Sequence, residues 1–397
     1  MSRSNEKPNF QSVPPPLWLM ALAVGVSVAN PFYSQSLLPK IKGAFQLSPG
    51  TVLQAPMITQ LGMALGFLLV LPLGDVREKR GLLTLLAIGM ALACGSVLLA
   101  PSFGLLLCSC FALGMVALIP SLMPPYLTAI TPEPTHGRML GIILSGQFSG
   151  LLLSRSVSGW VAELWDWRLI YAFSAIVMLA IALLFRTRLP DVAPTSKTSY
   201  WRLQRAQINL WYRHPLLRRS CISQGLLFGS FMAIWSAIAI YLSSPPWQFG
   251  PAVIGSFGFI GLASITAAPI IGRLVDHLGP DRIVLTGVLC ASGGFMLMGI
   301  HKQALSALAL GLMAVDLGVQ GSFIANQARI YSIDSAARSR MSSQLFLTCY
   351  LGAAACSTLI SLFWSQWGWA GTCMFAITLM GLAIVVERPT WQPRTHE

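Results

Sequence analysis

Charged residues are scarce in this chain. Asp, Glu, Lys and Arg make up only 10% of its 397 residues, whereas 55% of the residues are hydrophobic. A soluble globular domain carries about 25% charged residues. This deficit excludes an ordinary soluble fold, and the mean hydropathy of +0.67 agrees with that exclusion. The composition predicts a polytopic membrane protein.

The motifs of common enzyme and nucleotide-binding sites are absent as well. The sequence contains neither H-E-x-x-H nor the phosphate-cradling G-x-x-x-x-G-K-[ST], and it shows no Ser/His/Asp grouping. The five histidines are scattered, at His136, His214, His277, His301 and His396. We therefore expect no enzyme activity, no cofactor and no direct drive by ATP.

The eight cysteines do not follow a metal-binding pattern. All of them fall inside predicted membrane spans, and no second pair stands at the spacing of a zinc site. Cys108 and Cys110 are two residues apart, which in a helix turns their thiols about 200° away from each other. We interpret the cysteines as small apolar packing residues and expect no metal site.

Basic residues outnumber acidic residues by 26 to 13. With a cytoplasmic N-terminus, nearly all Lys and Arg residues fall on the cytoplasmic side of the predicted spans. The exceptions are Lys40, Lys42, Arg155, Arg168 and Lys302. This skew follows the positive-inside rule and predicts that both termini are cytoplasmic. Because the excess of basic residues is explained by topology, we expect no nucleic-acid partner.

Apolar runs of about 20 residues recur along the chain, and a helix of that length crosses ~30 Å of hydrocarbon. The predicted spans lie near residues 17–38, 52–73, 82–100, 103–124, 138–160, 168–186, 217–242, 252–273, 283–300, 303–325, 341–363 and 369–387. This pattern predicts an all-α polytopic membrane protein of twelve transmembrane helices. The predicted six-helix halves are residues 16–186 and 217–388, and the cytoplasmic linker between them is residues 187–216. The predicted cytoplasmic tails are residues 1–15 and 389–397.

The predicted linker is basic and contains tryptophan. Residues 200–215 read YWRLQRAQINLWYRHP. Trp201 and Ile208 interleaved with Arg202 and Arg205 suit a short helix that lies at the inner headgroups of the bilayer. A solvated basic loop is the alternative.

The two halves look like one unit written twice. A short charged hinge centred on Asp75, LPLGDVREKRGLL, lies between the second and third spans. GRLVDHLGPDR, centred on Asp276, takes the corresponding place in the second half, and Gly150 matches Gly352 at a similar offset. Duplicated halves in the same orientation are typical of transporters whose halves rock about a central site.

Both hinges resemble the loop signature of the major facilitator superfamily, G-x-L-x-D-x-x-G-R-K. The first hinge matches it at Leu73, Asp75, Lys79 and Arg80, and the second matches it at Gly272, Leu274, Asp276 and Gly279. The resemblance implies the major facilitator fold. It also assigns a latch role, in which one half meets the other, to Asp75, Arg80, Asp276, Gly272 and Gly279. A solvated turn whose cations only enforce topology is the alternative.

The fifth predicted span resembles the glycine-rich motif of the antiporter branch of that superfamily. Gly141, Gly150 and Gly159 match the motif, whereas Arg155 stands where the motif has proline. Small residues at these positions imply close packing of helices between the two halves.

Two further segments, 29–39 and 318–341, are similar to a bacterial subgroup of the drug:proton antiporter-like set. The resemblance implies a multi-pass transporter of the bacterial inner membrane that exports small organic molecules in exchange for protons. An importing proton symporter and a non-transporting membrane sensor on the same fold are the alternatives. We expect a monomer whose partners are a small-molecule substrate, protons and the lipid bilayer.

Two ionisable residues lie inside predicted spans, where a charge costs about 2.5–3.5 kcal/mol on insertion scales. Asp316, in the tenth span, can load and release a proton as the halves alternate; the alternative is an acid that only holds that helix to a neighbour. Arg155, in the fifth span, keeps its charge and therefore needs an anion, carbonyl groups or water. It can contact the substrate, pair with Glu163 or Asp166, or reach toward Asp316.

Polar and aromatic side chains in the central spans are the candidates for contacts with the substrate. Together with Arg155 they are Asn30, Tyr33, Gln35, Gln147, Gln224, Trp235, Tyr241 and Asn326. A buried amide without a partner is costly, so each amide hydrogen-bonds cargo, water or another helix. Bonding between helices is the alternative for each of them.

The latch assignment can be tested at Asp75. Replacing Asp75 with Asn removes the charge that the resemblance places against the opposite half, so the Asp75→Asn variant should cycle slowly while it still binds its cargo. Transport and cargo binding are to be measured at equal abundance in the membrane. Unchanged transport would contradict the latch assignment.

Overall fold

Every regular element in the described part of the chain is helical. The computed structural model describes residues 17–131, 135–194, 199–334 and 337–388, and it has no strand within these ranges. Hydrocarbon offers no hydrogen-bond partners to backbone N–H and C=O groups, whereas a helix pairs these groups internally. Long apolar runs therefore fold as helices in a membrane. The segments long and apolar enough to cross a membrane are Leu17–Ala44, Pro49–Val76, Lys79–Leu98, Phe103–Ile130, His136–Leu164, Leu169–Arg188, Pro215–Leu242, Pro251–Leu278, Pro280–Ile300, Leu305–Tyr331 and Arg340–Glu387.

The last of these eleven segments contains two helices. α17 (Arg338–Glu387) is 50 residues long, but Gly368 within it has φ 57° and ψ −138°, which is not a helical conformation. Glycine adopts positive φ at little cost because it has no Cβ. The chain therefore kinks at Gly368 and continues as a twelfth helix. The predicted all-α fold of twelve transmembrane helices is confirmed.

Several spans of the first half are built from more than one helical piece, whereas α6, α9 and α10 each form a whole span. The helices of this half are α1 (Leu17–Ala29), η1 (Asn30–Phe32), α2 (Tyr33–Ala44), α3 (Pro49–Val52), α4 (Gln54–Leu65), the π-helical η2 (Gly66–Val70), α5 (Leu73–Val76), α6 (Lys79–Leu98), α7 (Phe103–Val116), α8 (Ile119–Ile130), α9 (His136–Leu164) and α10 (Leu169–Arg188). The fourth span runs on to Ile130, beyond the predicted end near residue 124, because α8 tolerates Pro124 and Pro125 in its interior. Neighbouring helices can satisfy the backbone groups that a proline frees in a membrane helix.

The second half has fewer interruptions. It comprises α12 (Pro215–Leu242), α13 (Pro251–Ser256), η4 (Phe257–Gly261), α14 (Leu262–Leu278), α15 (Pro280–Ile300), α16 (Leu305–Tyr331) and α17. Between the halves, the linker forms a helix, α11 (Tyr200–Arg213), rather than a loop. Its hydrogen bonds reach both halves: Tyr200 Oη donates to Leu69 O at 2.9 Å, and Gln344 of α17 donates to Gln207 O.

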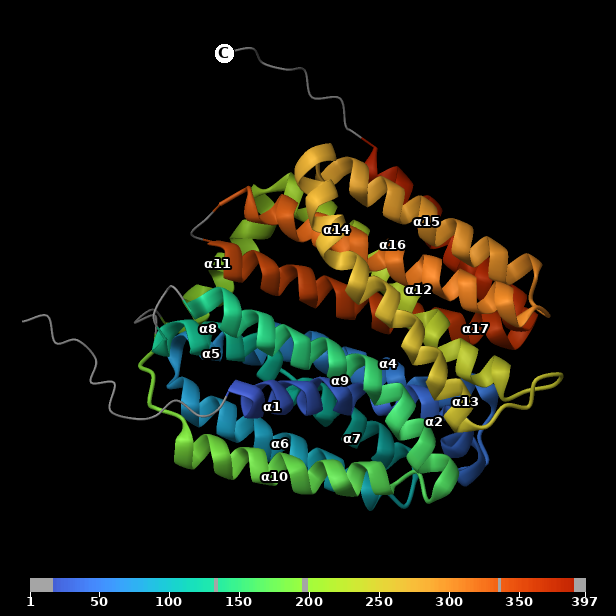
Figure 1. The fold of residues 1–397 in the computed structure, drawn as a ribbon, viewed down its shortest axis with the longest axis horizontal. Helices are drawn as coiled ribbons and strands as arrows, with labels where there is room; N and C mark the ends of the chain where they lie inside the picture. The colour runs from blue at the N-terminus through green and yellow to red at the C-terminus, as the bar shows by residue number, and fades with distance from the viewer. Residues whose placement is uncertain (1–16, 132–134, 195–198, 335–336, 389–397) are drawn as a thin grey trace, which may run out of the picture.

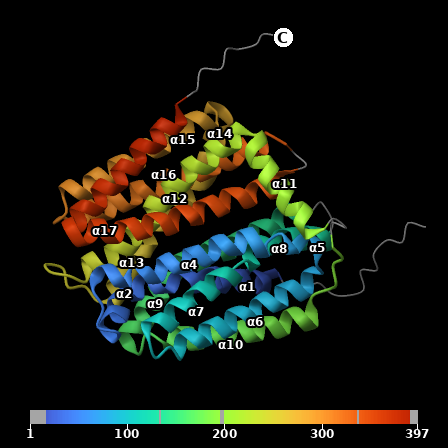
Figure 2. The same cartoon turned by 180° about the vertical axis from the view of Figure 1, so that it is seen from behind.

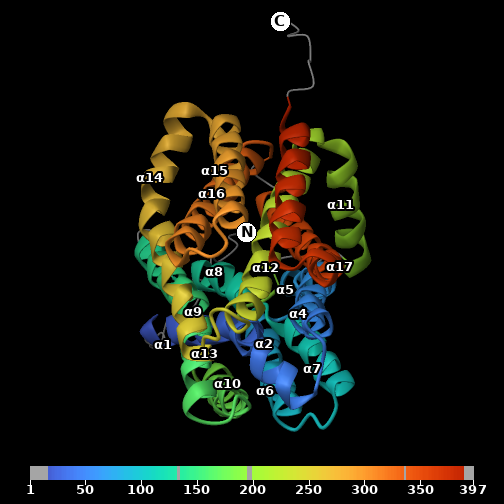
Figure 3. The ribbon, with the colours of Figure 1, turned by 90° about the vertical axis from the view of Figure 1, so that its right-hand side faces the viewer.

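The two halves lie side by side with their long helices running in the same general direction. In Figure 1 the first half, blue to green, lies below the second half, yellow to red. α11 lies at one end of the bundle and α2 and α13 lie at the other, as Figure 2 shows from behind. We call these the α11 end and the α13 end. The end view in Figure 3 shows α9 next to α13 on one side and α4 next to α17 on the other.

Within each half, a glycine pair brings two helices into close contact, so Gly150 packs inside the first half and not, as expected, between the halves. A Cβ atom added to Gly150 of α9 would lie 2.1 Å from the carbonyl oxygen of Gly25 in α1. In the second half, a Cβ atom added to Gly352 of α17 would lie 2.3 Å from the carbonyl oxygen of Gly225 in α12. Only glycine allows such an approach. The sequence match between Gly150 and Gly352 thus corresponds to the same helix crossing in each half.

The contacts between the halves are uneven along the bundle. α4 packs on α17, where Gln60 accepts a hydrogen bond of 3.2 Å from Ser357 and Phe67 stacks on Phe346 with ring centroids 5.1 Å apart. α9 packs on α13 and η4 near the α13 end. Beyond them α14 buries only two of its residues, Ser264 and Val275. The α9 side of the interface is therefore closed toward the α13 end and loosens toward the α11 end.

The glycine crossing can be tested by adding one methyl group. The Gly150→Ala variant should lose stability by about 1–3 kcal/mol, the usual cost of overpacking, because its Cβ would collide with the α1 backbone. Gly141→Ala is the matched control on the same helix, since an added Cβ there meets no described atom within 4 Å. Melting temperatures of the two variants in detergent are to be compared. Equal melting temperatures would contradict the close crossing.

Candidate functional site

Arg155 lies buried where α9 meets the second half. Its side chain is 6% exposed, and its Nε donates a hydrogen bond of 2.9 Å to Gln35 Oε1 of α2. The guanidinium carbon lies 4.2 Å from the ring centroid of Trp235 in α12, which is a cation–π geometry. Gln35 and Trp235 therefore stabilise the charge from opposite halves of the protein.

The guanidinium group of Arg155 is not fully satisfied. Its Nη2 has no hydrogen-bond partner among the described residues. An arginine cannot shed its proton to avoid this cost, so an unpaired buried guanidinium nitrogen is an open donor for an acceptor on another molecule.

Asp316 lies buried on the second half of the protein. It belongs to α16 and is 4% exposed, and the Ser264 hydroxyl of α14 donates a hydrogen bond to its Oδ2. A carboxylate has about four acceptor positions, so one hydroxyl donor leaves capacity for more. Ser264 is one of the two buried residues of α14, and it accordingly ties α14 to α16 at this point.

Arg155 and Asp316 attract each other without direct contact. Among the described residues no ion pair joins them, but each charge is within electrostatic reach of the other. Gly258 and Gly261 of η4 lie next to Arg155 and Asp316, respectively. A Cβ added to Gly258 would lie 3.4 Å from Arg155 Cβ, and one added to Gly261 would lie 3.7 Å from Asp316 Oδ2. Gly258 and Gly261 are three residues apart, which in a 3₁₀ helix is one turn, or about 6 Å of rise along the helix axis.

We refer to five of these residues as the charge centre. They are Gln35, Arg155, Trp235, Ser264 and Asp316. Of the possible partners of Arg155, the acids near the end of α9 are engaged elsewhere. Glu163 Oε2 accepts a hydrogen bond of 2.8 Å from the backbone N–H of Ala252 in α13, and Asp166 Oδ1 accepts one of 2.7 Å from the N–H of Arg168.

Four other predicted substrate contacts are not part of the charge centre. Asn30 accepts a hydrogen bond from Ser174 within the first half, and Tyr33 packs edge-on against Tyr171. Tyr241 stacks on Trp369 with centroids 4.5 Å apart and donates a hydrogen bond to Lys302 O. Gln147, in α9, is half-buried.

Gln224 and Asn326 belong to a polar network near the α11 end. Asn326 Nδ2 donates to Gln224 Oε1 at 3.0 Å, and Arg329 Nη1 donates to Asn326 Oδ1 at 3.1 Å. Arg329 in turn pairs with Glu387 at 3.2 Å and with Asp281 at 2.6 Å. These ties join α12, α15, α16 and α17, so the two amides hydrogen-bond other helices of the second half.

Sequence reasoning missed the acid–base core of this network. Arg329 and Glu387 each have side chains only 2% exposed, and Arg219 also contacts Glu387 at 2.8 Å. Arg329 had the appearance of a cytoplasmic loop residue because it follows a long apolar run. The available signal was its spacing of three residues from Asn326, which places both on one helix face.

The predicted latch residues occupy the two hinges. Arg80 pairs with Asp191, just after α10, and with Glu78 at 3.4 Å. The carboxylate of Asp75 attracts the ammonium group of Lys79. The hydrogen bond to Asp191 raises the pKa of Glu78. In this conformation Arg80 therefore ties the first hinge to the start of the linker.

The second hinge turns at Gly279. Its φ of +83° is a conformation that favours glycine, and it ends α14 just before α15 begins. Gly272 and Asp276 lie within the last turns of α14. In the glycine motif of α9, a Cβ atom added to Gly159 would lie 2.3 Å from the carbonyl oxygen of Pro251, so Gly159 supports the contact between the halves.

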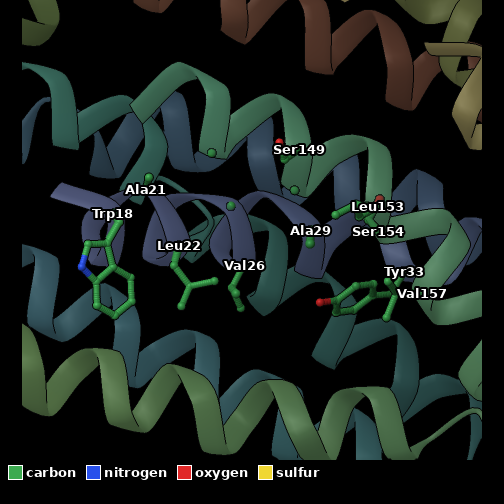
Figure 4. A pocket seen from close by; sticks show the side chains of 13 residues that line it. Trp18, Ala21, Leu22, Val26, Ala29, Tyr33, Ser149, Leu153, Ser154 and Val157 are labelled. Atoms are coloured by element: carbon green, nitrogen blue, oxygen red, sulfur yellow. The ribbon is translucent and has the colours of Figure 1, made fainter. Parts of the chain in front are cut away.

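An apolar groove of about 560 Å³ lies along α1 and α9. Figure 4 shows Trp18, Leu22 and Val26 along one wall and Val157 beside Tyr33. Trp18 is 64% exposed, and the lining includes neither Arg155 nor Asp316. The groove is therefore separate from the charge centre. No group of three or more His, Cys, Asp or Glu residues in the described ranges could hold a metal ion.

Comparison with known proteins gives consistent matches over nearly the whole chain. The family model described as "Major Facilitator Superfamily" matches residues 17–355. The chain is 30% identical over 383 residues to the "Uncharacterized transporter YgaY" of Escherichia coli O157:H7, and the match covers 96% of both chains. It is 26% identical over 359 residues to the "Probable transporter SCO4007" of Streptomyces coelicolor, covering 90% of this chain and 83% of that one.

Solved structures resemble the fold at low sequence identity. A D-xylose–proton symporter has a TM-score of 0.75 at 14% identity, covering 94% of this chain and 96% of that chain. A POT family transporter, crystallised with a thioalcohol-conjugated peptide, has a TM-score of 0.76 at 16% identity, with coverages of 95% and 97%. At these identities the likeness concerns the fold alone.

The buried ion network can be tested at Glu387. Removing one partner of a buried ion pair typically costs about 3–5 kcal/mol, so Glu387→Gln should lower the melting temperature markedly. Asp191→Asn is the control, because Asp191 is 62% exposed and an exposed pair contributes about 0–1 kcal/mol. The Arg329→Gln substitution should restore part of the stability of Glu387→Gln. Equal melting temperatures for the two single variants would contradict the structural role of the network.

Proposed function

This chain belongs to the Major Facilitator Superfamily of transporters, and we propose that it exports small organic molecules in exchange for protons. The observation that carries the proposal is the charge centre. Two buried charges of opposite sign lie on opposite halves, next to η4, where the halves meet. A group whose charge is stabilised from both halves is sensitive to how the halves are arranged.

Alternating access requires the contacts at the α13 end to break. Those contacts include the hydrogen bond from Ala252 to Glu163 and the close approach of Gly159 to Pro251. With both termini in the cytoplasm, the α13 end faces outward, and this conformation is closed to the outside. Separation of α9 from α13 would expose Arg155 and Asp316 to the outer solution.

Asp316 is the proposed proton carrier. A buried carboxylate without full compensation is costly, and binding a proton removes that cost. When the α13 end opens, water can deliver a proton to Asp316; when the α11 end opens, the proton can leave to the cytoplasm. Cargo that binds near the deprotonated carboxylate competes with the proton, and this competition produces exchange.

Efflux is the direction we propose because the fifth span resembles the glycine motif of the antiporter branch. Gly150 packs on α1 within the first half and Gly159 packs on α13 of the second half, and a Cβ added to either would lie less than 2.5 Å from a carbonyl oxygen. The bacterial relatives support a bacterial inner-membrane location. We further propose a monomer of the drug:proton antiporter-like subgroup.

Import by proton symport is the second candidate. The buried positive charge of Arg155, whose Nη2 has no partner in the described part of the chain, is the observation that favours it. A purely anionic cargo on Arg155 would add negative charge near Asp316 and so favour its protonation. Cargo and proton would then bind together and travel in the same direction. The two candidates differ in the sign of the proton movement that cargo evokes.

Proton flux in inside-out vesicles tests the function. In energised vesicles with an acidified lumen, adding a transported compound should release protons from the lumen, and Asp316→Asn should abolish the release at equal abundance. Asp166→Asn is the control, because Asp166 is exposed and its hydrogen bond is to Arg168, which is not part of the charge centre.

Three results would change the proposal. Proton movement into the lumen with the compound would favour symport. Full proton release by Asp316→Asn would remove Asp316 as the carrier. Binding of compounds without any proton movement would favour the membrane sensor.

A further inference from the structure

The charge centre offers one open donor site and one acceptor site of opposite charge. Gln35 of the first half holds Arg155 Nε and Trp235 of the second half covers the guanidinium face, which leaves Nη2 without a partner among the described residues. On the second half, Asp316 receives the Ser264 hydroxyl and keeps further acceptor capacity. A complementary ligand therefore presents an anionic group to Arg155 and a cationic group to Asp316.

We propose that the cargo is a small zwitterion, with a carboxylate and an amino group a few bonds apart. The inference rests on the proposed function and names the chemical class of its substrate. The carboxylate binds Arg155 and the ammonium group binds Asp316, so one molecule bridges the two halves.

The two charged side chains flank one short segment of the chain. Gly258 adjoins Arg155 Cβ and Gly261 adjoins Asp316 Oδ2, and these glycines are one 3₁₀ turn apart, about 6 Å of rise. The guanidinium group extends from Arg155 Cβ to the ring of Trp235. A small cargo that carries both charged groups near one end of its skeleton therefore suits the charge centre.

Charge balance favours a zwitterion over a singly charged molecule. A monovalent anion would pair with Arg155 but would leave Asp316 with excess negative charge, and a monovalent cation would do the reverse at Arg155. Burying an uncompensated charge is unfavourable. A zwitterion compensates both residues and adds no net charge to the closed centre.

The same arrangement explains exchange with protons. The ammonium group of the cargo and a proton both neutralise Asp316, so they compete for it. When the cargo leaves, a proton takes over that role, while Arg155 keeps its contacts with Gln35 and Trp235. A zwitterion thus makes efflux by antiport compatible with the buried arginine, whereas a simple anion would favour symport.

Aromatic groups beside the centre guide the choice of probes. Trp235 packs edge-on against Phe231, with ring centroids 6.3 Å apart, so an apolar substituent on the cargo has apolar neighbours. Phenylalanine, 2-phenylethylamine and 3-phenylpropanoate share one skeleton and are zwitterionic, cationic and anionic at neutral pH. Leucine, 3-methylbutylamine and 4-methylpentanoate form a second set with a smaller skeleton.

Binding of both sets to the purified full-length protein in detergent tests the inference. In at least one set, the zwitterion should bind at least 10-fold more tightly than either singly charged analogue. Arg155→Gln should abolish the preference for the zwitterion over the cation, and Asp316→Asn should abolish its preference over the anion. Arg168→Gln and Asp166→Asn, which alter charges at the protein's α13 end, should keep both preferences. Arg155→Lys keeps the charge and should retain part of the preference, which separates loss of charge from misfolding.

Two results would overturn the inference. One is a singly charged analogue that binds as tightly as the zwitterion in both sets, and the other is a lack of binding by both zwitterions. The vesicle assay separates this failure from failure of the proposed function. Zwitterion binding without proton movement would remove the antiport proposal alone, whereas proton movement driven only by singly charged compounds would remove the zwitterion alone.

Discussion

The buried charge of Arg155 is the constraint on which the contact between the halves depends. Its guanidinium keeps its charge in a protein, so the surrounding helices must stabilise it. Gln35 does this from the first half, and Trp235 does it from the second. Gly255, whose added Cβ would lie 2.3 Å from Arg155 O, lets α13 approach the same stretch of α9. Opening the α13 end therefore changes the surroundings of this charge directly, and through it those of Asp316.

Much of the fold was readable from the sequence because hydrocarbon imposes strict rules. Scarce charge and apolar runs of helical length predicted the twelve helices, and the matched residues Gly150 and Gly352 lie at equivalent crossings in the two halves. The boundary predicted between the last two spans, near residues 363–369, is confirmed by the non-helical conformation of Gly368. The end of the fourth span was missed because Pro124 and Pro125 suggest a helix end, whereas α8 accommodates them.

The site was readable only in part. Burial of a charge in a membrane marks Arg155 and Asp316 by itself, because such residues are costly without a purpose. When a helix is apolar on every side, its sequence does not show whether an amide side chain points into the cavity or toward another helix. Gln224 and Asn326 are therefore predicted as cargo contacts, whereas in the structure Asn326 donates a hydrogen bond to Gln224 and accepts one from Arg329. Their partners come from distant spans, and a single sequence does not show which spans adjoin.

The central claim is that protonation of Asp316 governs how the halves meet. Spin labels at Gly137 of α9 and His277 of α14, both exposed, would report the distance between the halves near the α11 end. Cys108 and Cys290 are exposed and would first be replaced by serine. The distance distribution of the otherwise unaltered protein should shift with pH, and that of Asp316→Asn should stay fixed. The same pH dependence in both proteins would contradict the account.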